Sequence, residues 1–168
     1  MPKIIENLES RLIEEAQKQI RQSGYGSLTI RSVAKACGVG DGTAYNYFPA
    51  KDDLSATSLL QAWRECVAAI ESASRQAETP EPVVRCIHTQ LTDFIALHQA
   101  VFTDEAAVAG FSGSPSPYHS LLRGQLAKPL RRFCNSDFTS EFIAEALLTW
   151  TVAGRSFDEI YTLIEKLL

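Results

Sequence analysis

Apolar residues recur at helical spacing along almost the whole chain, and no segment alternates between apolar and polar residues as a half-buried strand does. Residues 3–22, for example, place Leu8, Leu12 and Ala16 on one stripe of a helix. The pattern predicts an all-α protein. With 168 residues, the chain is long enough for one good core with a small subdomain attached.

Glycines and prolines divide this pattern into separate helices. The segment 110–117, GFSGSPSP, is a clear loop because it combines small residues with two prolines. Thr29 is suited to cap the second helix, and Gly38 to end it. The expected helices are 3–22, 30–37, 41–47, 51–77, 82–102, 103–109, 118–134, 138–155 and 157–168.

Residues 38–51, GVGDGTAYNYFPAK, hold three glycines within five positions. Such a segment could cradle a nucleotide phosphate, but the dinucleotide pattern G-x-G-x-x-G requires its third glycine one residue later and a preceding strand. A P-loop requires a lysine directly after the last glycine, where this chain has Thr43. Two short helices joined by a glycine-containing turn form a helix-turn-helix, and this is the interpretation that the segment favours.

The segment from Thr29 to Leu54 resembles the DNA-binding domain of the tetracycline-repressor (TetR) family, and the resemblance covers roughly residues 4–55. The matching positions, at the spacing typical of that family, are Thr29, Ile30, Val33, Ala34, Gly38, Val39, Gly42, Thr43, Tyr45, Tyr47, Phe48, Lys51 and Leu54. The resemblance implies a helix-turn-helix domain over residues 1–50 and a helical effector-binding and dimerisation domain over residues 51–168. It also implies a double-stranded DNA operator as partner.

The same resemblance implies that helix 41–47 is the recognition helix and enters the major groove. Thr29, Thr43, Tyr47 and Lys51 would then contact phosphates, and Tyr45 the backbone or a thymine methyl group. An asparagine can hydrogen-bond adenine through two atoms, so Asn46 is a candidate for reading a base. The full set of expected DNA-binding residues is Thr29, Arg31, Gly40, Asp41, Gly42, Thr43, Tyr45, Asn46, Tyr47 and Lys51.

Three residues depart from the family pattern. Gly40 stands where serine is usual, and Ala44 is smaller than the usual leucine. Asp41 brings a carboxylate toward DNA, which repels phosphates unless the carboxylate accepts a hydrogen bond from the N4 amine of cytosine. The net charge of −4 gives no general attraction to DNA either. A helical binding module that has lost DNA binding therefore stays open as an alternative.

The C-terminal part is expected to bind a small effector, as the family resemblance implies. The aromatic content points to an apolar or aromatic molecule, although most of these side chains also suit a helical core. The candidate effector-binding residues are Trp63, Cys66, His88, Leu91, His98, Phe102, Tyr118 and His119.

The last two expected helices are apolar on more than one face, which suggests burial on two sides. A second copy of the chain can supply the second side, and two recognition helices would then read a near-palindromic operator. The expected homodimer interface comprises Phe142, Ile143, Ala146, Leu147, Trp150, Phe157, Ile160, Tyr161 and Ile164. Repression released by effector binding is the default of the family.

Other classes of function find little support in the sequence. Cys86 and His88 lie two residues apart and would point to different faces of a helix, so we expect no metal site and no cofactor. The GFSGS segment lacks the final glycine of a nucleophile elbow, which argues against an enzyme. The acidic N-terminus and the lack of long apolar runs predict a cytoplasmic protein without membrane contact. A thiol-based sensor using Cys37 stays open.

Overall fold

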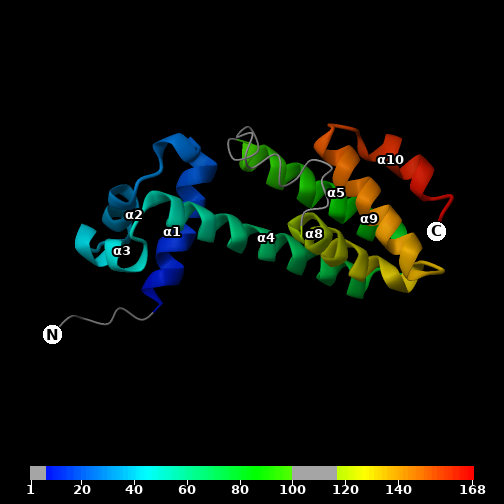
Figure 1. The fold of residues 1–168 in the computed structure, drawn as a ribbon, viewed down its shortest axis with the longest axis horizontal. Coiled ribbons are helices and arrows are strands. Elements are labelled where there is room, and N and C mark those ends of the chain that lie inside the picture. Colours follow the sequence, from blue (N-terminus) through cyan, green and yellow to red (C-terminus); the bar gives the residue numbers. More distant parts are fainter. Residues whose placement is uncertain (1–6, 100–116) are drawn as a thin grey trace. The chain divides into compact units, whose positions relative to one another are not determined.

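The computed structural model describes residues 7–99 and 117–168, and every regular element in these ranges is a helix (Figure 1). The predicted all-α fold is therefore confirmed. The chain divides into two compact units, Met1–Trp63 and Arg64–Leu168, and the boundary falls inside the long helix α4 (Lys51–Gln76). The expected functional division at residues 50 and 51 stays a prediction.

The N-terminal unit contains α1 (Leu8–Ser23), a 3-10 turn η1 (Tyr25–Ser27), α2 (Ile30–Cys37), α3 (Asp41–Tyr47) and the first part of α4. Its core side chains include Leu12, Ala16, Ile20, Leu28, Ile30, Val33, Ala34, Ala44, Phe48 and Leu54. Within this core, the side-chain amide of Gln17 donates to the carbonyl of Ser58, at 3.4 Å, and joins α1 to α4. Helix α3 packs mainly against α2, and it contributes a single buried residue of its own, Ala44.

The C-terminal unit contains the rest of α4 together with α5 (Pro80–Leu97), α8 (Pro117–Ala127), η2 (Lys128–Phe133), α9 (Asp137–Val152) and α10 (Phe157–Ile164). Its core side chains include Val83, Val84, Ile87, Leu91, Leu126, Leu130, Ile143, Leu147, Ile160 and Ile164. Polar contacts support this packing, because the Ser74 hydroxyl donates to the Pro129 carbonyl at 2.7 Å and joins α4 to η2.

Helix boundaries follow the local chemistry. The expected helix 118–134 changes to a 3-10 helix at Lys128, where Pro129 lacks the N–H of a regular α-helical turn. Helix α5 begins at Pro80, two residues before the expected start, because proline is well suited to the first helical position. The expected helix 103–109 and almost all of the loop 110–117 lie outside the described residues. No helix in the described ranges is both long and apolar enough to cross a bilayer.

Candidate nucleic-acid interface

The corner between α2 and α3 has the geometry that the sequence predicts. Gly38 adopts a left-handed conformation (φ 71°, ψ 30°), which side chains other than glycine adopt only at a cost. The backbone N–H of Val39 donates to the Ala34 carbonyl at 3.0 Å and closes the C-terminal end of α2. Gly40 then caps α3 without a side-chain hydrogen bond, as expected where serine is missing. The segment is therefore a helix-turn-helix.

Helix α3 lies on the surface of its unit. Ala44 is its only buried residue, and all of its other residues are exposed. Tyr45 and Tyr47 leave 41% and 43% of their surface to solvent, although aromatic rings usually pack against a core. The exposed face carries Asp41, Gly42, Thr43, Tyr45, Asn46 and Tyr47, all of which are predicted DNA-binding residues.

The neighbouring predicted residues lie at the ends of α2 and α4. Thr29 caps α2, and its hydroxyl oxygen accepts the backbone N–H of Ser32 at 3.0 Å. Lys51 is the first residue of α4, directly after the turn that follows α3. The backbone N–H of Ala50 donates to the Asp53 carboxylate at 3.0 Å and fixes this helix start. The helix-turn-helix thus brings hydroxyl, aromatic and cationic groups to three helix ends within one unit.

An ion pair joins the two helices of the motif. Nε of Arg31 on α2 lies 3.5 Å from Oδ2 of Asp41 on α3, and both side chains are largely exposed. Sequence reasoning selected both residues but did not predict that they pair. The pairing depends on how α2 and α3 pack against each other, which the periodicity of one helix does not show.

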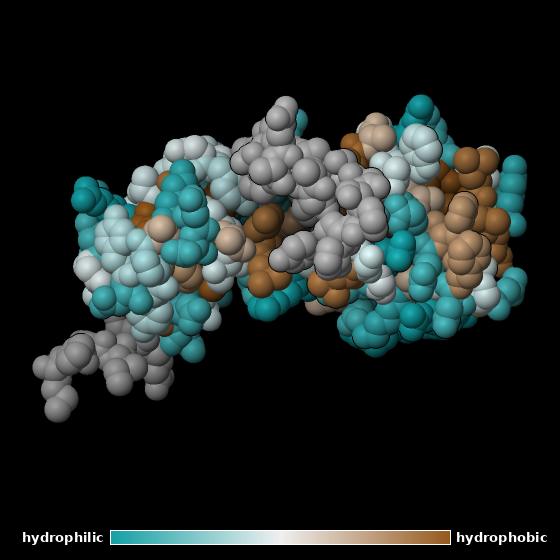
Figure 2. Space-filling model, in the orientation of Figure 1, coloured by the Kyte–Doolittle hydropathy of each residue, from teal (hydrophilic) through white to brown (hydrophobic). Residues whose placement is uncertain are grey.

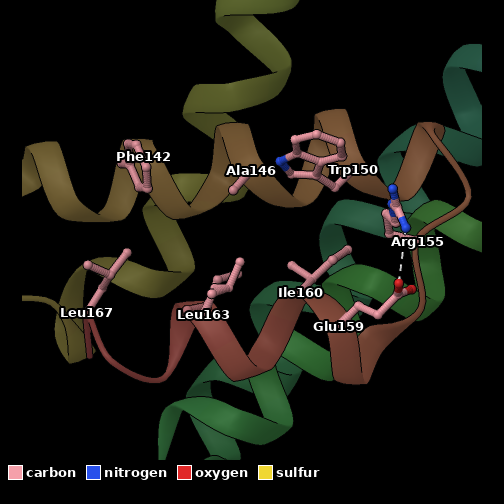
Figure 3. A pocket seen from close by; sticks show the side chains of 9 residues that line it. Phe142, Ala146, Trp150, Arg155, Glu159, Ile160, Leu163 and Leu167 are labelled. Carbon is pink, nitrogen blue, oxygen red and sulfur yellow. Dashed lines mark hydrogen bonds and ion pairs between the residues drawn. The ribbon is translucent and has the colours of Figure 1, made fainter.

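An apolar groove of about 460 Å³ runs between α9 and α10 in the C-terminal unit. Figure 3 shows Phe142, Ala146 and Trp150 along α9, facing a second row from α10 and the residues after it. The ion pair between Arg155 and Glu159, at 3.1 Å, closes one end. Figure 2 shows hydrophobic side chains gathered at the surface over α10 and the C-terminus. The full lining is Phe142, Ala146, Trp150, Arg155, Glu159, Ile160, Leu163, Ile164 and Leu167.

The residues of the expected dimer interface occupy different environments in the C-terminal unit. Ile143 and Leu147 are buried inside the protomer, and Ile160 and Ile164 form the floor of the groove. Phe142 and Trp150 are exposed by about half of their surface, so α9 is indeed apolar on two faces. Ala146 lines the groove as well, and the last two residues, Phe157 and Tyr161, stack on each other with ring centroids 5.0 Å apart. Leu163 and Leu167 are exposed members of the groove that sequence reasoning missed.

Several of the effector candidates have structural partners. Nε2 of His88 lies 3.0 Å from the Arg155 carbonyl, and His98 is buried with its ring 4.5 Å from that of Phe94. His119 contacts the Glu145 carboxylate at 2.8 Å. Leu91 and Trp63 are buried, and Cys66 is half-buried. Phe102 lies outside the described residues, and so does the side chain of Tyr118. Their effector role stays a prediction.

Within the part of the chain that the structure describes, all four cysteines are free thiols that form no disulfide. Burial raises the pKa of Cys37, and it raises the pKa of Cys66 to about 11, with Glu65 and Asp93 adding to the rise. A thiol with a raised pKa holds its proton near neutral pH and reacts slowly with oxidants. No group of three or more metal-ligating side chains occurs among residues 7–99 and 117–168.

Comparison with known proteins finds relatives of the helix-turn-helix segment. Residues 12–56 match the family model of bacterial regulatory proteins of the tetR family. The HTH-type transcriptional regulator BetI of Brucella canis is 35% identical over 89 residues, which are 52% of this chain and 45% of BetI. The uncharacterised HTH-type regulator YuxN of Bacillus subtilis is 30% identical over 91 residues, 54% of this chain and 31% of YuxN. The match therefore spans less than half of each relative.

Solved structures share the fold over nearly the whole chain. A transcriptional regulator from Streptomyces coelicolor A3(2) has a TM-score of 0.68 at 13% identity, with 96% of this chain and 98% of that one covered. The multidrug binding protein EbrR, solved with imidazole, has a TM-score of 0.63 at 18% identity, with coverage of 95% and 89%. The relatives that match in sequence are transcriptional regulators rather than enzymes. Through residues 12–56, this chain is similar to the tetR family of bacterial regulatory proteins.

Proposed function

We propose that this protein is a transcriptional regulator that binds double-stranded DNA by placing α3 in the major groove. The observation that carries the proposal is the exposure of α3, in which Ala44 alone is buried. A helix of this diameter fits the major groove of B-DNA, and its exposed side chains can then reach the base edges. Folding alone gives no reason to expose two tyrosines within one short helix.

Phosphate contacts hold the motif on the duplex in this proposal. The hydroxyl of Thr29 accepts its capping bond through oxygen, so its O–H can donate to a phosphate. Lys51 contributes a positive charge at the start of α4, and Tyr47 a second hydroxyl donor. Such contacts fix the position of the recognition helix but carry no sequence information.

A homodimer through the groove between α9 and α10 completes the proposed DNA reader. One helix reads too few bases for specificity, whereas two helices about 34–36 Å apart match successive major grooves of a near-palindromic operator. Phe142, Trp150 and Leu163 leave large apolar surfaces exposed, which a second copy of the same groove would cover. In this arrangement the buried residues Ile143 and Leu147 support the interface from inside the protomer.

A small effector controls DNA binding in this proposal, and the regulator acts as a repressor. EbrR, whose fold is similar, has been solved with imidazole and with malachite green. An effector weakens DNA binding when it binds more tightly to a conformation in which the spacing of the two recognition helices does not match the operator. The size of the effect is set by the difference in effector affinity between the two conformations. A coupling of about 1–3 kcal/mol is sufficient for regulation. A DNA operator as partner also implies action in the cytoplasm.

Selection of bound sites from random duplexes tests this proposal directly. We expect a near-palindromic site whose half-site centres lie about 10 base pairs, or a multiple of this, apart. The affinity for this site should fall steeply with salt, because each phosphate contact releases counterions. The absence of any enriched duplex at 50 mM salt would exclude DNA binding and favour a helical binding module.

A further inference from the structure

The ion pair between Arg31 and Asp41 places a carboxylate on the surface that the proposed function assigns to DNA. Asp41 is the first residue of α3, and its side chain is 54% exposed. Arg31 on α2 is 77% exposed, and its Nε lies 3.5 Å from Oδ2 of Asp41. The contact joins the two helices of the motif, and both of its side chains remain largely open to solvent.

Fold stability gives only a small reason for this pair. An exposed ion pair contributes little to stability, because water and salt screen it. A carboxylate in the first turn of a helix adds a further small stabilisation through the helix dipole. Arg131 and Asp137 form a matching pair at the first residue of α9, with Nε and Oδ1 3.4 Å apart. This second pair serves as a control for the same arrangement away from the recognition helix.

On DNA, the location of Asp41 matters more than its charge. In a helix-turn-helix, the N-terminal residues of the second helix contact base edges, while the first helix crosses the backbone. An isolated carboxylate at that location would repel the phosphates, but the guanidinium of Arg31 offsets this charge. Because Nε of Arg31 faces Asp41, its Nη groups can donate to a phosphate.

The bases differ in what they offer a carboxylate. In the major groove, cytosine presents the N4 amine, a donor, and no acceptor of its own. Guanine presents two acceptors, thymine an acceptor and a methyl group, and adenine an acceptor next to its donor. A carboxylate therefore favours cytosine over the other three bases.

We propose that Asp41 reads a cytosine in each half-site and that Arg31 is its positioning residue. This inference rests on the proposed function. It names the base that the first residue of α3 selects, and it turns the departure of Asp41 from the family pattern into a determinant of specificity. Arg31 has two roles in it, since it orients the carboxylate and binds the adjacent phosphate.

The test is the selection from random duplexes, carried out in parallel on the full chain and on the variants D41A, D41N, R31A, R31K and D137N. The wild type should enrich cytosine at one position of each half-site. D41A should reduce that preference about tenfold, and D41N should shift it toward adenine, which an amide can bond through two atoms. R31A should weaken both the preference and the general affinity, whereas R31K should restore the affinity but only part of the preference. D137N should change neither.

Thermal unfolding of the same proteins separates a structural role from base reading. If D41A and D137N lose equal stability while D41A still selects the wild-type bases, Asp41 only stabilises its helix and the inference is overturned. A wild type that selects a site without cytosine at the position affected by D41A overturns it as well. A wild type that enriches no duplex overturns the proposed function, and the inference with it.

Discussion

Arg11 and Cys37 hold each other through two hydrogen bonds between α1 and the end of α2. Nη2 of Arg11 donates to the Cys37 carbonyl at 2.9 Å, and Sγ of Cys37 lies 3.5 Å from the Arg11 carbonyl, to which it donates. Cys37 is the last residue of α2 and directly precedes Gly38. The pair therefore fixes the helix-turn-helix corner to the first helix of its unit.

Removal of this link should destabilise the N-terminal unit. We expect Arg11→Ala to lower the free energy of unfolding by about 1–2 kcal/mol, because the hydrogen bond from a charged group to the last carbonyl of α2 is lost. Urea denaturation measures the change. Arg21→Ala, an exposed substitution in the last turn of the same helix, is the control and should cost less than about 0.5 kcal/mol. Equal losses in the two variants would show that the link contributes nothing specific.

The raised pKa of the Cys66 thiol predicts a particular dependence on pH. The pKa of about 11 in the folded protein lies above the ordinary value of 9.0, so the folded state holds the proton more tightly. The stabilising contribution of the protonated thiol is complete below pH 9 and is lost as the pH rises toward 11. Alkylation with iodoacetamide, followed by mass spectrometry, should show half-maximal reactivity near pH 11 in the native protein and near pH 9 in urea.

The pKa of the Cys37 thiol is also raised, and this argues against the thiol-sensor hypothesis. Burial raises its pKa, so little thiolate is present at pH 7. Treatment with peroxide at neutral pH should therefore leave DNA binding unchanged, in the wild type as in Cys37→Ser. Loss of binding in the wild type alone would revive the sensor hypothesis.

Gly38 and Gly42 should respond to alanine in opposite directions. Neither position has a heavy atom within 4 Å of an added Cβ, so space does not distinguish them. Gly38 has a positive φ, and alanine there should cost about 1–2 kcal/mol. Gly42 lies inside α3, where alanine should stabilise the helix by about 0.5–1 kcal/mol. Thermal unfolding distinguishes the signs.

Gly42→Ala also separates stability from DNA binding. If the backbone of α3 approaches the duplex closely at this residue, the more stable variant should bind its selected site more weakly in a gel-shift titration. Unchanged or stronger binding would mean that the added methyl group meets no DNA.

The comparison of sequence and structure shows which features local chemistry determines. Thr29 and Gly38 are a cap and a turn residue whose roles depend on their immediate neighbours, and the structure confirms both. The two faces of α9 follow from the periodicity of its own residues. The pairing of Arg31 with Asp41 depends on how two helices pack, and the partners of His88 and His119 come from segments distant in the sequence. Periodicity within one helix contains no information about such contacts.

Lys51 should contribute to affinity without affecting sequence preference. A lysine that contacts phosphate acts on every duplex alike. We expect Lys51→Ala to weaken binding of selected and random duplexes by the same factor and to reduce the slope of log affinity against log salt by about one. Asn46→Ala is the matched comparison on α3 and should change preference at one base if Asn46 reads it. A change in base preference caused by Lys51→Ala would contradict its assignment to the backbone.

The groove between α9 and α10 predicts how charge affects assembly. Trp150 lines the groove and Val152 does not, although both lie on α9 and are exposed to almost the same extent, 49% and 51%. Residues two apart on a helix point to different faces, so the two positions form a matched pair. Trp150→Glu should leave the protomer folded, because the side chain is not part of its core, but it should prevent a second copy from covering the groove.

Sedimentation at micromolar concentration should therefore show a dimer for the wild type and for Val152→Glu, and a monomer for Trp150→Glu. The monomeric variant should also bind a near-palindromic site much more weakly than a wild type that engages both half-sites at once, while single half-sites bind both proteins alike. If Trp150→Glu remains a dimer, the interface lies on another surface. If the wild type is monomeric with and without DNA, this groove does not join two recognition helices. The proposed control of DNA binding by an effector that changes their spacing would then be wrong.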